Sequence, residues 1–375
     1  MPLTYISSLN RWSPDKIHRT DSAVINILFD CERMKYPNTG LYHFCLQLGQ
    51  ALIRNMNPVS ENISFYLPAR AGKLFGEALN YIDQKSWHKF QFPDLANFDI
   101  WHCTYQGSSY KPGSNKIKEV LTIHDLNFLY EHSLRPDKIK RSLKRIQTQI
   151  DRADRICAIS EYAKMDVQNH LQLHNKKIEV VYNGCNINKI GHLKQPQFLP
   201  ASPFIFTLGT VTSKKNFHVL PSLLIKNDLL LIITGVTQQK EYKKRIIDEA
   251  IKYGVSERVF FTGPVSENDK QWYLQHCEAF VFPSIAEGFG LPVIEAMAFG
   301  KPIFLSTNTS LPEIGGETAY YFKSFDADEM LQTFETGMKH YRSNDLAESI
   351  RNRAATFNWD HAALKYIEIY RSLYQ

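Results

Sequence analysis

The sequence has no run of about 18 consecutive apolar residues, the length that a transmembrane helix requires. Its first 21 residues are polar and contain no apolar segment typical of a secretory signal. The 44 Lys and Arg residues nearly balance the 38 Asp and Glu residues, and a net charge of +6 does not indicate a nucleic-acid partner. These absences favour a cytoplasmic protein that binds no nucleic acid.

Cysteine is scarce, and its spacing excludes the usual metal sites. Several of the cysteines lie within apolar runs typical of buried strands. We therefore expect reduced, mostly buried thiols, as is usual in the cytoplasm. The residues concerned are Cys31, Cys45, Cys103, Cys157, Cys185 and Cys277.

A chain of 375 residues is longer than one ordinary hydrophobic core supports, so we expect two domains. Short apolar runs alternate with helical patterns along the whole chain, and a proline-rich break at 195–203 divides them into two series. This alternation predicts parallel sheets with helices on both faces. The expected strands are 26–30, 64–67, 100–103, 120–124, 155–159 and 178–182, and after the break 204–208, 229–234, 259–262, 280–282 and 303–305.

The predicted fold class is therefore α/β, with two Rossmann-like, doubly wound domains that face a common cleft. The expected boundaries are 1–195 for the first domain and 196–358 for the second. The segment 359–375 is rich in aromatic and aliphatic residues, and we expect it to form a helix that returns to the N-terminal domain.

The segment 287–295, Glu-Gly-Phe-Gly-Leu-Pro-Val-Ile-Glu, carries the clearest chemical pattern. An expected buried strand leads into a glycine turn, and the turn opens a helix whose free N–H groups favour phosphate. Glu287 stands at the mouth of this site, and Glu295 lies about one turn inside the helix. Carboxylates favour hydroxyl groups. A ligand with both phosphate and hydroxyl groups is a nucleotide sugar.

A second loop, 209–216, follows the first strand of the C-terminal domain and reads Gly-Thr-Val-Thr-Ser-Lys-Lys-Asn. Lys214 and Lys215 can neutralise a diphosphate leaving group. Taken alone, the loop is equally well explained as a solvated basic turn. Its place in the same domain as Glu287 and Glu295 favours the diphosphate site.

Together these segments resemble the retaining GT-B glycosyltransferases of family 4, also called group 1. Glu287 and Glu295 match the E-x7-E motif of that family, and 209–216 matches its G-T-x-x-x-R/K-K-N loop. The resemblance covers nearly the whole chain in order, although each motif is loose by itself. The other matching pieces are 38–40, 122–125, 158–161, 181–184 and 311–313.

The resemblance implies a role for individual residues. Lys215 and Lys214 would bind the donor diphosphate, and Glu287 would contact the hydroxyl groups of the sugar. Glu295 would bind the ribose, and His124 would point at the transferred sugar. The remaining donor-site residues would be Gly40, which lets the backbone approach the phosphates, then Gly209, Thr210, Gly263, Pro264, Val265, Phe289, Gly290 and Leu291.

One departure from the family pattern bears on the donor. Many members carry Arg after the first glycine of the loop, whereas this chain has Thr210, so the positive charge would come from Lys214 and Lys215. A subgroup with Thr at this place includes mannosyltransferases of polysaccharide assembly. The resemblance therefore favours GDP-mannose as the donor, with a UDP-sugar as the alternative.

The implied activity is retaining transfer of a sugar to a glycan or lipid-linked acceptor in polysaccharide or lipopolysaccharide biosynthesis, without a metal or another cofactor. The N-terminal domain would bind the acceptor and the C-terminal domain the nucleotide sugar. A nucleotide-sugar epimerase or hydrolase is an alternative class, for which His124 and Asp125 are the only candidate acid–base pair. A binding-only relative is a third class, and the intact Glu287, Glu295 and lysines argue against it.

Several other residues have more than one interpretation. His124 either contacts the sugar, acts as a general base, or has only a structural role at the end of a strand. Glu313 is catalytic or structural. His102 and Cys103 line the cleft or are buried, and Tyr105 and Phe128 are candidates for an acceptor groove. The pattern Asp326-Ala327-Asp328 binds metal in a different transferase fold, but here it precedes a helix and predicts an N-cap.

A basic cluster is the last feature of note. The cluster lies on one predicted helix, which also carries an apolar stripe of Ile139, Leu143, Ile146 and Ile150. The opposite side is either an ordinary solvated face or a surface for an anionic membrane, which would place the protein peripherally at the inner face of that membrane. The cations are Lys138, Lys140, Arg141, Lys144, Arg145 and Arg152.

Overall fold

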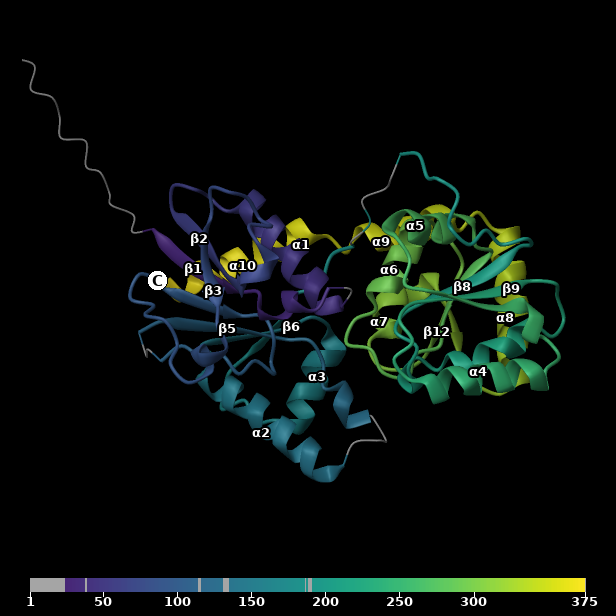
Figure 1. Cartoon of the computed structure of the whole chain (residues 1–375), viewed down its shortest axis with the longest axis horizontal. Helices are drawn as coiled ribbons and strands as arrows, with labels where there is room; N and C mark the ends of the chain where they lie inside the picture. Colours follow the sequence, from purple (N-terminus) through teal and green to yellow (C-terminus); the bar gives the residue numbers. More distant parts are fainter. Residues whose placement is uncertain are drawn as a thin grey trace, which may run out of the picture.

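The computed structural model describes residues 24–37, 39–113, 116–130, 135–185, 187 and 191–374. The polar segment 1–21 and Asn38, on which expectations were placed above, lie outside these residues. The described chain forms two α/β domains, each built on a parallel sheet (Figure 1).

The N-terminal sheet has seven strands in the order β3-β2-β1-β4-β5-β6-β7. Its strands are β1 (Ile25–Asp30), β2 (Glu61–Pro68), β3 (Asn80–Gln84), β4 (Ile100–Cys103), β5 (Lys118–Ile123), β6 (Arg155–Ala158) and β7 (Ile178–Val180). The helices of this domain are α1 (Gly40–Asn55), α2 (Pro136–Arg152) and α3 (Glu161–His170).

The C-terminal sheet has six strands in the order β10-β9-β8-β11-β12-β13. Its strands are β8 (Phe204–Leu208), β9 (Leu230–Thr234), β10 (Val259–Gly263), β11 (Ala279–Phe282), β12 (Ile303–Ser306) and β13 (Tyr320–Phe322). The helices are α4 (Lys240–Lys252), α5 (Glu267–His276), α6 (Leu291–Ala298), α7 (Leu311–Gly315), α8 (Ala327–Ser343) and α9 (Ala347–Ala355).

In both sheets the chain starts at a central strand, moves to one edge and then returns to build the other side. This order is that of the Rossmann fold, and it creates a switch point between β1 and β4 and another between β8 and β11. The α/β class and the two doubly wound domains are thus confirmed. The domain boundaries 1–195, 196–358 and 359–375 stay predictions.

All eleven expected strands are present, but β3 and β13 were not predicted. Both are edge strands. β3 has no fully buried residue and includes Asn80, Asp83 and Gln84, while β13 has only three residues. β3 lacks the continuous apolar run by which buried parallel strands are recognised, and β13 is shorter than the usual run of about four to eight residues.

Alternate residues of β1 point to opposite sides of the N-terminal sheet. Ile27 and Phe29 pack into the core that contains α1, and Leu28 packs into the core beneath α2 and α3. Side-chain caps mark the starts of α1, α3, α5 and α8; at α3 the Oγ of Ser160 accepts the N–H of Ala163 (3.0 Å). The sequence signals for strands and helix starts therefore agree with the packing.

The last helix, α10 (Trp359–Tyr374), packs on the N-terminal domain, as expected; Figure 1 shows it in yellow beside the purple strands and α1. The hydroxyl of Tyr370 lies 2.6 Å from His102 Nδ1, and that of Tyr366 lies 2.8 Å from Thr122 Oγ1. His102 is fully buried, and burial lowers its pKa to about 3. Its role is to hold α10, so the burial interpretation is correct.

All six cysteines are free thiols, and five of them are buried, with Cys185 the partly exposed one. The expectation of reduced, mostly buried thiols is therefore confirmed. Within the described ranges, every helix is too short or too polar to cross a bilayer.

Candidate functional site

The two loops singled out in the sequence meet at the switch point of the C-terminal sheet. The loop 209–216 follows β8, and the segment 283–290 follows β11, the neighbouring strand. Ile285 N–H donates to the carbonyl of Lys214 at 2.9 Å, so the loops are directly joined. The fold therefore places the lysines and Glu287 where doubly wound sheets bind ligands.

Lys215 and Glu287 form an ion pair, with 2.5 Å between Nζ and Oε1. The side chains are only 12% and 14% exposed. Ser284 Oγ donates to the same oxygen of Glu287 at 2.6 Å, and the Lys215 ammonium lies 4.8 Å from the centroid of the Phe282 ring. The ion pair neutralises two charges that are largely removed from solvent.

Gly209 makes room for this lysine. Its φ of +154° lies in the region that favours glycine, and a Cβ there would come within 3.2 Å of Lys215 Cε. Gly235, which follows β9, lies close to the same loop. A Cβ on Gly235 would lie 2.1 Å from the carbonyl oxygen of Gly209. Larger residues would displace the lysine or the loop.

The helix that follows Glu287 begins without a side-chain cap. α6 starts at Leu291, and its N-cap, Gly290, has a φ of +113° and gives no side-chain cap. The first N–H groups of a helix have no partner within the helix and carry partial positive charge. Phe289, Gly290 and Leu291 therefore lie where amide groups can hold an anion or a hydroxyl.

Glu295 lies on the buried part of α6 and forms an ion pair with Lys270 at 3.2 Å. Lys270 also contacts Glu267 at 2.9 Å. Burial alone would lower the pKa of Lys270, but the two carboxylates outweigh it and raise that pKa above its usual value. Lys270 therefore stays charged and lies between the carboxylates of Glu267 and Glu295.

The base-pocket candidates lie at the end of β10. Gly263 closes this strand with a φ of +71°, and Pro264 and Val265 connect it to α5. Thr210 lies in the loop after β8, ahead of Lys214 and Lys215. On the other domain Gly40 begins α1, and a Cβ there would meet nothing within 4 Å, so nothing within the protein itself requires glycine.

His124 and Asp125 follow β5 and lie against the segment 283–290, the candidate donor loop. A Cβ on Gly288 would lie 2.5 Å from the carbonyl oxygen of His124, so only glycine allows this approach. His124 Nε2 donates to the carbonyl of Thr104 at 2.8 Å, and burial together with the charge of Arg33 lowers the pKa of His124 to about 4. His124 is thus neutral near pH 7, and a group so weakly basic is a poor general base.

The pKa of Asp125 is raised above its usual value. Burial raises its pKa, while the charge of Lys214 lowers it and that of Glu287 raises it again. These influences reach Asp125 from the other domain. The carboxyl of Asp125 therefore belongs to the same electrostatic site as the two lysines and Glu287.

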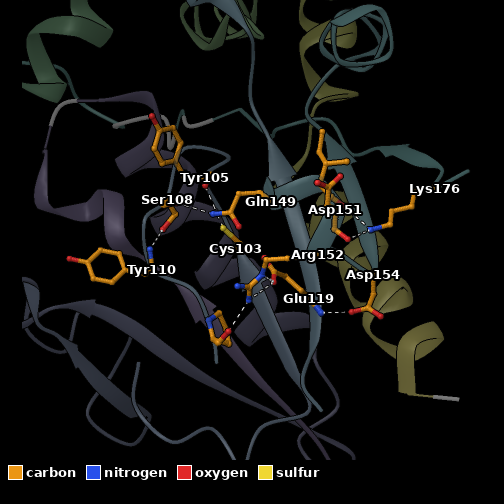
Figure 2. Close-up of polar contacts among 12 residues, drawn as sticks. Cys103, Tyr105, Ser108, Tyr110, Glu119, Gln149, Asp151, Arg152, Asp154 and Lys176 are labelled. Carbon is orange, nitrogen blue, oxygen red and sulfur yellow. Dashed lines mark hydrogen bonds and ion pairs between the residues drawn. The ribbon is translucent and has the colours of Figure 1, made fainter. Parts of the chain in front are cut away.

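Side chains of α2 hold the loop after β4 (Figure 2). Gln149 Nε2 donates to the carbonyl of Ser108 at 2.8 Å, and Arg152 donates to the carbonyl of Pro112 at 2.8 Å. Ser108 Oγ in turn donates to Glu32 at 2.6 Å. Tyr105, on the same loop, lies under the guanidinium of Arg33 at 4.5 Å from its ring centroid. The loop is fixed at the carboxyl edge of the N-terminal sheet, where an acceptor would lie.

Other interpretations from the sequence are settled by contacts. Asp326 Oδ1 accepts the N–H groups of Asp328 (3.0 Å) and Glu329 (3.2 Å), so the predicted N-cap is correct. Phe128 packs against the core beneath α2. The described residues contain no group of three or more His, Cys, Asp or Glu side chains arranged to hold a metal ion.

Sequence reasoning missed the groups that support the site. Thr309 Oγ1 accepts the N–H of Glu287 at 3.0 Å, and Ser310 Oγ donates to the carbonyl of Phe289 at 2.9 Å. Ser284 and Lys270 were also missed. No local pattern marks these residues, because their contacts join segments distant in sequence. The roles assigned to the donor-site residues themselves stay predictions.

Comparison with known proteins agrees with this geometry. The family model described as "Glycosyl transferases group 1" matches residues 192–356, and the model "Glycosyltransferase Family 4" matches residues 61–189. Together they cover more than three quarters of the chain. The chain belongs to the group 1 glycosyltransferases.

Its sequence relatives include enzymes named as mannosyltransferases. This glycosyltransferase is 29% identical over 283 residues to the serotype-specific mannosyltransferase WbdA of Escherichia coli, a match that covers 69% of this chain and 34% of WbdA. The chain thus spans about a third of the length of this relative. The O-antigen chain mannosyltransferase B of Escherichia coli is 22% identical, with 93% of this chain and all of that protein covered.

Solved structures share the fold. The glycosyltransferase of Rickettsia africae matches with a TM-score of 0.70 at 16% identity, covering 94% of this chain and 99% of that one. Sucrose-phosphate synthase from Thermosynechococcus elongatus matches with a TM-score of 0.70 at 18% identity, covering 93% and 99%. The fold of this glycosyltransferase is GT-B, as the sequence predicted.

Proposed function

We propose that this glycosyltransferase moves a sugar from a nucleoside-diphosphate sugar to a glycan or lipid-linked acceptor, with retention of configuration. The observation that carries the proposal is the contact between Lys215 and Glu287, 2.5 Å apart at the switch point and beside the open start of α6. A diphosphate needs cations and amide groups, and a sugar needs hydrogen-bond acceptors. This corner of the sheet offers all three.

In the proposed reaction the donor separates the ion pair. The diphosphate takes the ammonium of Lys215, and Glu287 becomes free to accept hydrogen bonds from the sugar. Departure of the nucleoside diphosphate then leaves negative charge, which Lys215, Lys214 and the start of α6 stabilise. The acceptor hydroxyl attacks the anomeric carbon from the face of the leaving phosphate, and a phosphate oxygen takes its proton. No metal and no further cofactor are needed for this charge balance.

The basicity of His124 distinguishes this proposal from an epimerase. Epimerisation needs a positioned acid–base pair, and His124 is held neutral with its Nε2 proton donated to Thr104. The neutral ring offers only Nδ1, an acceptor, to a sugar hydroxyl, and a single hydrogen bond of this kind fits transfer better than epimerisation. The weak basicity of His124 therefore favours the transferase, and the epimerase and the hydrolase are outcomes of the test below.

The donor and the pathway are proposed from the relatives. Both sequence relatives described above are named as mannosyltransferases, and one acts on the O-antigen chain by name. Thr210, in place of the arginine common in the family, points the same way. We therefore favour GDP-mannose as donor and polysaccharide or lipopolysaccharide assembly as the setting, with a UDP-sugar as the alternative.

The proposed location is the cytoplasmic face of a membrane. The outward cations Lys138, Lys140, Lys144 and Arg145 on α2 are all exposed. The other two cations of the cluster are exposed as well, but Arg141 forms an ion pair with Asp137, and Arg152 forms one with Glu119 at 3.3 Å and holds the loop after β4. The other four cations lie on the outer face of the helix that supports the loop after β4. Attraction of this face to an anionic membrane would bring a lipid-linked acceptor to the cleft.

The decisive experiment incubates the protein with GDP-mannose and a panel of UDP-sugars, with and without lipid-linked glycan acceptors. Acceptor-dependent release of the nucleoside diphosphate and formation of an α-linked product from an α-linked donor are expected. Release of diphosphate that ignores the acceptor identifies a hydrolase, and an altered donor sugar identifies an epimerase. Either result, or binding without turnover, refutes the proposal.

A further inference from the structure

A carboxylate of the C-terminal domain caps a helix of the N-terminal domain. Glu313, on α7, accepts the N–H of Glu161 with one oxygen (2.7 Å) and the N–H of Tyr162 with the other (3.0 Å). These are the first two residues of the ten-residue helix α3. Their N–H groups have no partner within the helix, and the positive end of the helix dipole favours a carboxylate.

The short segment that carries Glu313 also holds the donor loop. Thr309 accepts the N–H of Glu287, and Ser310 donates to the carbonyl of Phe289. Thr309 has a φ of +55°, an unusual conformation for a β-branched residue that persists only where the surroundings impose it. Five consecutive residues, 309–313, therefore connect the donor loop to the start of α3.

Further contacts fix both ends of this connection. Ser160, the N-cap of α3, donates its hydroxyl to the carbonyl of Gly288 at 2.8 Å. Arg353 donates to the carbonyls of Glu313 (2.6 Å) and Ile314 (3.2 Å), which anchors α7 within its own domain. Burial and a hydrogen bond to Glu313 raise the pKa of the Tyr182 hydroxyl, so this hydroxyl stays protonated at physiological pH.

We propose that Glu313 is a positioning residue that sets the distance between the donor and acceptor domains during sugar transfer. The inference rests on the proposed transferase function. Lys215 and Glu287 lie on one domain, and His124 and the loop after β4 lie on the other. The attacking hydroxyl must come within about 3 to 3.5 Å of the anomeric carbon, and a misplacement of about 1 Å costs roughly 100-fold in rate. Glu313 acts through this spacing and contacts neither Lys215 nor His124.

The test compares Glu313→Ala and Glu313→Gln with Glu317→Ala. Glu317 lies four residues further on and is exposed, and the N–H groups of Glu161 and Tyr162 are both bonded to Glu313 instead. We expect kcat to fall about 10- to 100-fold in Glu313→Ala and less in Glu313→Gln, whose amide keeps one acceptor oxygen. The dissociation constant for GDP should change less than about 2-fold, because Lys214, Lys215 and Glu295, the charged groups proposed to hold GDP, all lie on the C-terminal domain. Glu317→Ala should match the wild type in both.

Hydrogen exchange gives a readout independent of activity. The amides of Glu161 and Tyr162 should exchange faster in Glu313→Ala and keep their wild-type rate in Glu317→Ala. An active wild type with unchanged kcat in folded Glu313→Ala overturns the inference, and so do unchanged exchange rates at these two amides. Absence of acceptor-dependent turnover in the wild type refutes the proposed function instead, and the exchange rates still test the contact across the domains.

Discussion

At the scale of residues, Lys215 and Glu287 neutralise each other in a position where neither charge is well solvated. The same two groups are the proposed contacts for a phosphate and a sugar hydroxyl. Each group therefore occupies the place of the other's proposed ligand. The bound donor would replace the ion pair by an ionic contact between Lys215 and phosphate and a hydrogen bond from a sugar hydroxyl to Glu287. Such a site stays compensated before binding and needs little rearrangement afterwards.

This arrangement gives a direct kinetic prediction. Lys215→Ala and Glu287→Ala should each lower kcat by at least about 100-fold, the scale of removing one preorganised transition-state contact. The measurement is steady-state release of nucleoside diphosphate with the acceptor present. Lys226→Ala and Glu317→Ala remove exposed charges elsewhere in the same domain and should leave kcat within about 2-fold. A near-normal rate in either site variant would refute its assignment.

At the scale of elements, the exposed side of α2 is basic and its inner side holds the loop after β4 (Figure 2). Lys176 donates to the carbonyls of Ile150 (2.8 Å) and Asp151 (2.7 Å), so the end of the helix is also fixed. One rigid helix thus joins a candidate membrane surface to a candidate acceptor loop.

Binding to vesicles tests the outer face. The triple variant Lys138→Gln, Lys140→Gln and Lys144→Gln should bind anionic vesicles roughly 100-fold more weakly, since each lysine near such a surface contributes about 1 kcal/mol. Cosedimentation with phosphatidylserine vesicles measures the partition. The control, Lys226→Gln with Lys240→Gln and Lys244→Gln, makes the same charge change on the C-terminal domain. Equal partition of both variants, or binding insensitive to salt, would mean that α2 is an ordinary solvated helix.

Elements were predictable where one local pattern sufficed. β8 and β11 are continuous apolar runs, and the cap at Asp326 is visible as an acidic pair before a helix. β3 and β13 were not predicted, because β3 is a largely polar edge strand and β13 is an edge strand of only three residues. The role of Glu313 escaped for another reason: its partners, Glu161 and Tyr162, are about 150 positions away, and only the folded domains bring them together.

At the scale of the whole molecule, the chain passes between the domains twice, and the two passages touch. Cys185 N–H donates to the carbonyl of Phe357 at 3.0 Å, just before α10 begins. A Cβ on Gly184 would lie 2.3 Å from the backbone nitrogen of Trp359. Glycine at this crossing therefore lets the first passage and the returning helix lie against each other.

Substitution at the crossing should disturb the whole molecule. Gly184→Ala forces the two passages apart, and we expect a loss of about 1 to 3 kcal/mol in the free energy of unfolding, typical of overpacking. Denaturant titration of the intact protein measures it. Gly191→Ala is the control, because a Cβ there meets nothing within 4 Å. If the two variants are equally stable, the passages are not tightly packed at Gly184.

The central claim is that the Lys215–Glu287 pair is the donor site, and a crystal structure with bound GDP tests it most directly. The account predicts that the diphosphate contacts Lys215 Nζ and the amide groups of 289–291 at the start of α6, and that Nζ leaves its position 2.5 Å from Glu287 Oε1. A diphosphate bound elsewhere, with this ion pair intact, would contradict it.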